Sequence, residues 1–128
     1  MVYASTTLSL ATLEVLVHCN KQSFLNARVM IRFELEDARI EQLPENELPE
    51  TWNSIPESVN TQHIGDAWIK QGSATGLLVP SATLPTLQVE ERNVLLNPNL
   101  PDMLEHLKAV EVQPFATDSR LASLLHSA

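Results

Sequence analysis

The sequence has little of what several common functions require. Its 128 residues contain a single cysteine, Cys19, so no disulfide can form within the chain, which fits a reducing compartment. Only 8 residues are basic against 16 acidic ones, the formal net charge is −8, and no basic run occurs. Nucleic acids and anionic membrane surfaces bind through clustered Lys and Arg. We therefore expect neither to be a direct ligand.

Long apolar runs and targeting patterns are also lacking. No apolar stretch is long enough to span a bilayer. The N-terminus has neither the basic region nor the apolar run and cleavage pattern of a signal peptide. We therefore expect a cytoplasmic protein. The hydrophobic fraction of 44%, with 3 Gly and 8 Pro, is typical of a folded globule, and the length fits one domain, residues 1–128.

Motifs for metals, nucleophilic catalysis and nucleotides are absent as well. The histidines His18, His63, His106 and His126 lack the spacing of metal ligands, so we expect no metal site. A Cys–His nucleophile pair is disfavoured, because adjacent residues such as His18 and Cys19 point about 100° apart on a helix. No Gly-rich turn joins a strand to a helix, which excludes the dinucleotide fingerprint and the P-loop.

Hydrophobic periodicity predicts helices and short strands that alternate irregularly. We expect helices at about residues 6–19 and from Ser58 or Thr61 to Gly72, a helical turn at 102–107, and strands at 28–35, 76–79, 94–96 and 110–115. Residues 36–57 are predicted to form an acidic, Pro-containing excursion anchored by Trp52, and residues 118–128 a short helix or a frayed end. This order favours an α+β fold with a mixed or antiparallel sheet and flanking helices.

The strand at 28–35 has the clearest pattern. Val29, Ile31, Phe33 and Leu35 alternate with polar or long side chains, which predicts a half-buried strand whose apolar face lies in the core. Near the N-terminus, Tyr3 is expected to end a strand that leads into the first helix.

Several residues stand where chemistry is plausible, yet each has an ordinary structural explanation. Glu14 lies in an apolar helix segment, where a carboxylate either faces solvent or lies in a cleft with partners. Ser81 follows a buried strand and Pro80, a place for functional side chains and for turn residues alike. Asn93 and Asn97 bracket an apolar strand, where Asn commonly forms turns. Taken singly, none of them establishes a reaction.

Five segments together resemble the RES domain family, which is named for its Arg, Glu and Ser. In order, they are VYAS (2–5) with LATLEVLVH (10–18), SVNTQHIGDAW (58–68), LVPSA (78–82), ERNVLLNP (91–98), and the closing PF (114–115) with DSRL (118–121). Their order and spacing agree with the family over nearly the whole chain.

The resemblance implies an ADP-ribosyltransferase-like fold and the toxin of a bacterial toxin–antitoxin pair. Members degrade NAD⁺, so NAD⁺ is the implied substrate and no cofactor is implied. The implied partner is an Xre-type helix-turn-helix antitoxin whose C-terminal part blocks the toxin's cleft. By position, Glu14 matches the family Glu and Ser81 the family Ser, both catalytic, while Tyr3 matches the aromatic of the pocket and Asn93 lies in the family's Asn-rich strand, both as substrate-binding residues.

One departure from the family pattern leaves alternatives open. The family Arg lies on a strand before the matching Tyr, whereas only Met1 and Val2 precede Tyr3. We therefore expect an N-terminally incomplete domain that cleaves little NAD⁺ by itself. The alternatives are an inactive remnant that only binds an antitoxin or oligomerises, and a small binding module outside the family. The acceptor (water, phosphate or protein) and the oligomeric state, homo-oligomer included, stay open.

Overall fold

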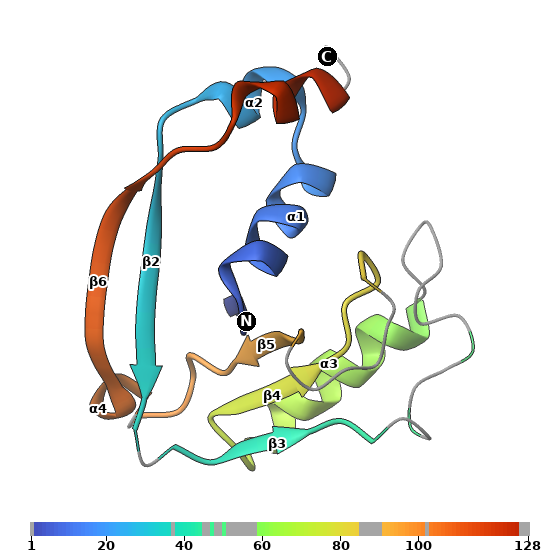
Figure 1. Ribbon diagram of the computed structural model, residues 1–128. Coiled ribbons are helices and arrows are strands. Elements are labelled where there is room, and N and C mark those ends of the chain that lie inside the picture. The colour runs from blue at the N-terminus through green and yellow to red at the C-terminus, as the bar shows by residue number, and fades with distance from the viewer. Residues whose placement is uncertain are drawn as a thin grey trace.

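The computed structural model describes residues 2–36, 38–44, 47, 50, 59–84, 91–101 and 103–125. In chain order the elements are β1 (Val2–Ser5), α1 (Leu8–His18), α2 (Lys21–Leu25), β2 (Arg28–Leu35), β3 (Ile40–Gln42), α3 (Val59–Gln71), β4 (Gly76–Val79), β5 (Asn93–Leu96), α4 (Met103–His106), β6 (Leu107–Phe115) and the 3₁₀ helix η2 (Ser119–Leu124). These elements confirm the α+β class (Figure 1).

A four-stranded mixed sheet contains the strands whose ends carry or adjoin Ser5, Ser81 and Asn93. Its order is β1-β5-β4-β3, with β5 antiparallel to both β1 and β4, and β3 parallel to β4. Ser5 at the end of β1 lies opposite Asn93 at the start of β5, which in turn lies opposite Val79 at the end of β4. One row across the sheet therefore joins the chain entering α1 to the loop that carries Ser81.

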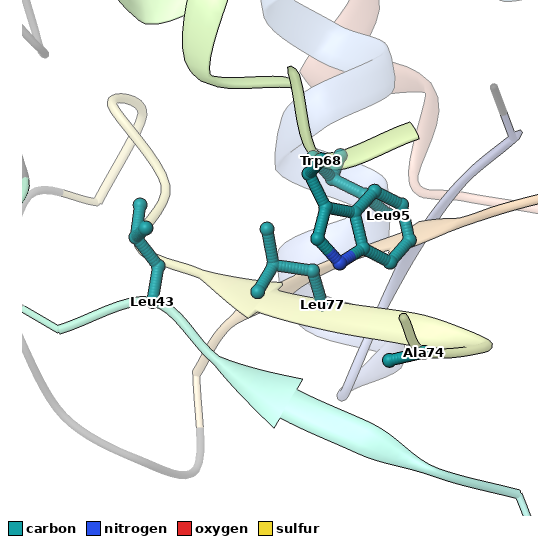
Figure 2. Close-up of a cluster of buried hydrophobic side chains, with 5 residues drawn as sticks. All are labelled: Leu43, Trp68, Ala74, Leu77 and Leu95. Carbon is teal, nitrogen blue, oxygen red and sulfur yellow. The ribbon is translucent and has the colours of Figure 1, made fainter. Parts of the chain in front are cut away.

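The apolar core lies between α3 and this sheet. Its buried members form one cluster of five residues, Leu43, Trp68, Ala74, Leu77 and Leu95 (Figure 2). Leu77 and Leu95 are cross-strand partners, so they share the face of the sheet that meets α3. The helix ends where expected, since Gly72 has φ +61° and its N–H donates to the Trp68 carbonyl over 3.3 Å.

The strands β2 and β6 form a separate antiparallel ribbon, which stands to one side of α1 (Figure 1). The span predicted for residues 28–35 is confirmed, but the predicted burial of its apolar face is wrong for Val29 and Ile31, which are 60% and 58% exposed. Val112, the cross-strand partner of Ile31, is 61% exposed. The ribbon has only two strands, and among the described residues no layer covers these side chains. Half of the expected core face is therefore on the surface.

Several other expectations change in detail. The strand predicted at 110–115 begins at Leu107, because Leu107 and Lys108 pair with β2 beyond a bulge. The excursion predicted at 36–57 contains β3, which pairs in parallel with β4. Trp52, its expected anchor, lies outside the described residues. The short helix α2 was not predicted, and part of the tail forms η2.

In the part of the chain that the structure describes, no helix has the length and apolar character needed to cross a membrane.

Candidate functional site

The start of α1 directs Glu14 toward the protein. Thr7 caps the helix, because its Oγ1 accepts a hydrogen bond from the backbone N–H of Leu10 over 3.2 Å. Leu10 is fully buried and anchors the first turns of α1. Residues four apart lie on the same face of a helix, so Glu14 follows Leu10 on the inward side. Its side chain is only 21% exposed.

The carboxylate of Glu14 is the centre of a hydrogen-bonded cluster. Its Oε1 accepts from the hydroxyl of Ser81 and, over 2.9 Å, from Nδ2 of Asn93. Its Oε2 lies 3.3 Å from Nε2 of His18, which is 75% exposed. Ser81 is fully buried, and its Oγ accepts the backbone N–H of Thr83 over 3.1 Å. The structure thus brings together Glu14, Ser81 and Asn93, three of the four residues that the family resemblance assigned to the site.

These contacts determine the charge of Glu14. Burial alone would raise its pKa. The hydrogen bonds from Ser81 and Asn93, the charge of His18 and a hydrogen bond from Thr83 act in the opposite direction, and the pKa of Glu14 lies below its ordinary value. Glu14 is therefore an anion at neutral pH, held in a partly buried place by donors from the loop after β4 and from the start of β5.

Tyr3 lies outside this cluster. It is in the middle of β1, opposite Leu95, and its side chain is 73% exposed. Because side chains alternate along a strand, Tyr3 and Ser5 point to the same face of the sheet. Its ring is accessible to a ligand, but no hydrogen bond of the described residues links it to Glu14.

Sequence reasoning missed the segment just before α1. Ser5, Thr6 and Thr7, here called the hydroxyl clasp, were not among the predicted site residues. All three bond to the segment before or at the start of β5, as Ser5 does to Asn93, Thr6 to Arg92 and Thr7 to Glu91. Thr83 was missed too. The available signal was a run of three hydroxyl residues between a strand and a helix.

A shallow concavity of about 480 Å³ lies at the end of α1. It is lined by residues 16–20 at the end of α1 and by Leu124 and Leu125. His18 belongs both to this lining and to the contacts of Glu14, so it connects the two. Among the described residues no group of three or more His, Cys, Asp or Glu side chains is arranged to hold a metal ion.

Comparison with known proteins finds a matching family and several relatives. The RES domain model matches residues 1–118. The chain is 38% identical over 120 residues to a protein named Toxin Res from Yersinia enterocolitica, and the match covers 94% of this chain and 76% of the relative. It is 37% identical over 120 residues to Toxin Res from Photorhabdus laumondii, covering 94% of this chain and 74% of that one.

A third relative has a more specific name. It is the Prs ADP-ribosylating toxin of a Sphingobium species, 32% identical over 124 residues, with 94% of this chain and 74% of the relative covered. The interpretation as a small binding module outside the family is thereby excluded. A family match over residues 1–118 and these three relatives show that the chain belongs to the RES domain family.

Proposed function

We propose that this chain is the NAD⁺-cleaving, ADP-ribosyltransferase-like component of a toxin–antitoxin pair. The observation that carries the proposal is the ionised carboxylate of Glu14, braced by Ser81 and Asn93 in a partly buried place. The names of the relatives, two Res toxins and an ADP-ribosylating toxin, support the same chemistry.

The proposed reaction breaks the bond between nicotinamide and ribose. The bonding pair stays with the nicotinamide nitrogen, so the positively charged ring leaves as a neutral molecule without needing a proton. The ribose is left with a developing positive charge, as in the cleavage of other glycosides. An acceptor then forms the new bond at the same ribose carbon. A fixed anion near that carbon lowers the barrier, because it stabilises charge that exists only in the transition state.

Glu14 is suited to this role because its two oxygens have different surroundings. Oε1 is occupied by donors from Ser81 and Asn93, which hold the group in place. Oε2 lies on the side of the exposed His18 and is the oxygen we assign to the substrate. We assign Ser81 to holding Glu14 rather than to touching NAD⁺, since the Ser81 side chain is fully buried.

The two substrate-binding assignments follow from exposure. Tyr3 has an accessible ring on the strand that leads into α1, and such a ring can stack on nicotinamide. Asn93 is half-buried, and with one N–H on Glu14 and its oxygen on Ser5 it retains a second N–H for a ligand.

The test is release of nicotinamide from NAD⁺ by matched variants. The parent chain is assayed as it stands and with an N-terminal strand carrying the Arg that the family resemblance implies. In the extended form, Glu14→Gln should lower kcat by about two orders of magnitude or more, because Gln keeps the shape of the side chain and loses its charge. Ser81→Ala should lower kcat with little change in KM, because Glu14 then loses a donor that holds it in place. Glu105→Gln, an exposed glutamate on α4, serves as the control.

Two outcomes would contradict the proposal. An extended, folded chain that releases no nicotinamide would favour the inactive remnant that only binds an antitoxin or oligomerises. A Glu14→Gln variant with full activity would show that another group stabilises the charge. Thermal melting of each variant separates loss of chemistry from loss of fold.

A further inference from the structure

Three consecutive residues before α1 bond in order to three consecutive residues at β5. Ser5 Oγ donates to Oδ1 of Asn93 over 2.9 Å. Thr6 and Arg92 exchange two bonds, from the Arg92 N–H to the Thr6 hydroxyl over 3.0 Å and from the Thr6 N–H to the Arg92 carbonyl over 2.9 Å. The Thr7 hydroxyl donates to Oε2 of Glu91 over 2.7 Å. The hydroxyl clasp therefore joins the β1–α1 junction to the start of β5.

Within the clasp, Ser5 bonds directly to Asn93, a residue of the Glu14 cluster. Ser5 and Asn93 are direct cross-strand partners, so their side chains lie next to each other on one face of the sheet. The Asn93 amide uses both of its ends, since its oxygen accepts from Ser5 and its nitrogen donates to Glu14 over 2.9 Å. The hydrogen bonds thus form a chain from Ser5 through Asn93 to Glu14.

We propose that Ser5 is a positioning residue that holds the Asn93 amide in the rotamer from which it braces Glu14. The proposal rests on the function proposed above for its catalytic consequence. A carboxylate is only an acceptor, so Glu14 requires the nitrogen end of the amide to face it. The oxygen end then needs a donor, and the Ser5 hydroxyl is the donor present.

Without that hydroxyl, the amide oxygen of Asn93 is left unsatisfied in a half-buried place. Such a group turns toward water because an unmade hydrogen bond costs more than a weak one. The turn withdraws the nitrogen from Glu14, which loses one of its donors and becomes easier to protonate. The effect falls on the positioning of the carboxylate and hence on kcat, with little change in KM.

The first measurement needs no substrate. In the isotope-labelled 128-residue chain, NMR follows the side-chain amide of Asn93 and the carboxyl carbon of Glu14 as the pH is lowered. Ser5→Ala should shift the amide resonances and raise the pKa of Glu14. Ser5→Thr, which keeps the hydroxyl, should restore both. Ser9→Ala removes an exposed hydroxyl from α1 and should change neither.

If Ser5→Ala weakens the fold, a second pair keeps the comparison matched. Ser5→Thr and Ser5→Val have the same shape and differ in the hydroxyl alone, and both suit a strand. A Val variant with the same Asn93 resonances and Glu14 titration as the Thr variant would overturn the proposal.

Nicotinamide release then tests the catalytic consequence. In a form that cleaves NAD⁺, Ser5→Ala should lower kcat about tenfold and leave KM nearly unchanged. An unchanged kcat beside an altered Glu14 titration would overturn this catalytic role. If no form cleaves NAD⁺ while the NMR changes occur, the positioning of Asn93 by Ser5 is supported and the proposed function fails. The two failures are thus distinguishable.

Discussion

Glu14 shows how a partly buried carboxylate can remain charged. Its helix places it 21% exposed, where loss of solvent opposes ionisation. Donors from the loop after β4 and from the first residue of β5 outweigh that effect. Because the donors come from segments that the sheet holds together, the low pKa of Glu14 is a property of the folded state and disappears on unfolding.

The pH dependence of stability should therefore depend on Glu14. A carboxyl whose pKa is lower in the folded state stabilises the fold at pH values above its unfolded pKa, and this contribution is lost as the pH falls through the folded pKa. Relative to Glu14→Gln, the parent should be more stable near neutral pH, and the difference should shrink below about pH 4.

Urea unfolding of both proteins across this range measures the difference. Ser9→Ala, an uncharged change on the same helix, should keep the parent's pH profile. A constant difference between parent and Glu14→Gln at every pH would show that the hydrogen bonds of Glu14 do not distinguish its charged form.

At the scale of elements, the two sheets differ in what covers them. The face of β4 and β5 that meets α3 is buried, with Leu77 only 4% exposed. The ribbon β2–β6 leaves Val29, Ile31 and Val112 more than half exposed. Apolar residues occur in both sheets, but only those that are covered by other elements contribute to the free energy of unfolding.

Matched substitutions should separate the two sheets. Leu77→Ala opens a cavity beside Trp68 and should lower the free energy of unfolding by about 2–5 kcal/mol. Ile31→Thr keeps a β-branched side chain on an exposed face and should change it by less than about 1 kcal/mol. Chemical denaturation of the two variants gives both values. A loss for Ile31→Thr as large as that for Leu77→Ala would mean that the ribbon face is covered in solution.

At the scale of the whole molecule, the net charge and the exposed groups of the proposed site limit which partners would be complementary. The net charge of −8 opposes direct contact with DNA. The proposed site presents an anion, Glu14, and an exposed aromatic ring, Tyr3, to the outside. A segment of another protein with a basic side chain and an apolar neighbour would be complementary to both.

We predict that the chain binds an Xre-type helix-turn-helix antitoxin and reaches DNA only through it. The antitoxin's C-terminal segment should lie at Tyr3 and Glu14, with a basic side chain near Glu14. Co-expression with a helix-turn-helix protein encoded beside this chain, followed by co-purification, tests this. Tyr3→Ala should weaken the complex about tenfold or more, as expected for an exposed aromatic at an interface, while Leu104→Ala, which alters an exposed residue on α4, should not.

Failure of two folded proteins to co-purify would remove the toxin–antitoxin interpretation. It would leave the enzymatic proposal standing, because nicotinamide release does not depend on the partner.

Local features of the sequence were sufficient to predict several helices and strands. Thr7 caps α1, Leu10 and Glu14 follow at helical spacing, β2 has its predicted bounds, and Gly72 ends α3. Each of these depends on interactions within a few residues, which the order of residue types determines. The match of five segments also identified the family without any structure.

The tertiary structure decided which of the candidate residues meet. Glu14 is 67 residues from Ser81 and 79 from Asn93, and Ser5 is 88 residues from Asn93. Their contacts depend on the register of β1 with β5 and of β5 with β4, which no local pattern specifies. The same holds for Ile31, because alternation along a strand shows that one face is apolar, and only the packing of other elements determines whether that face is covered.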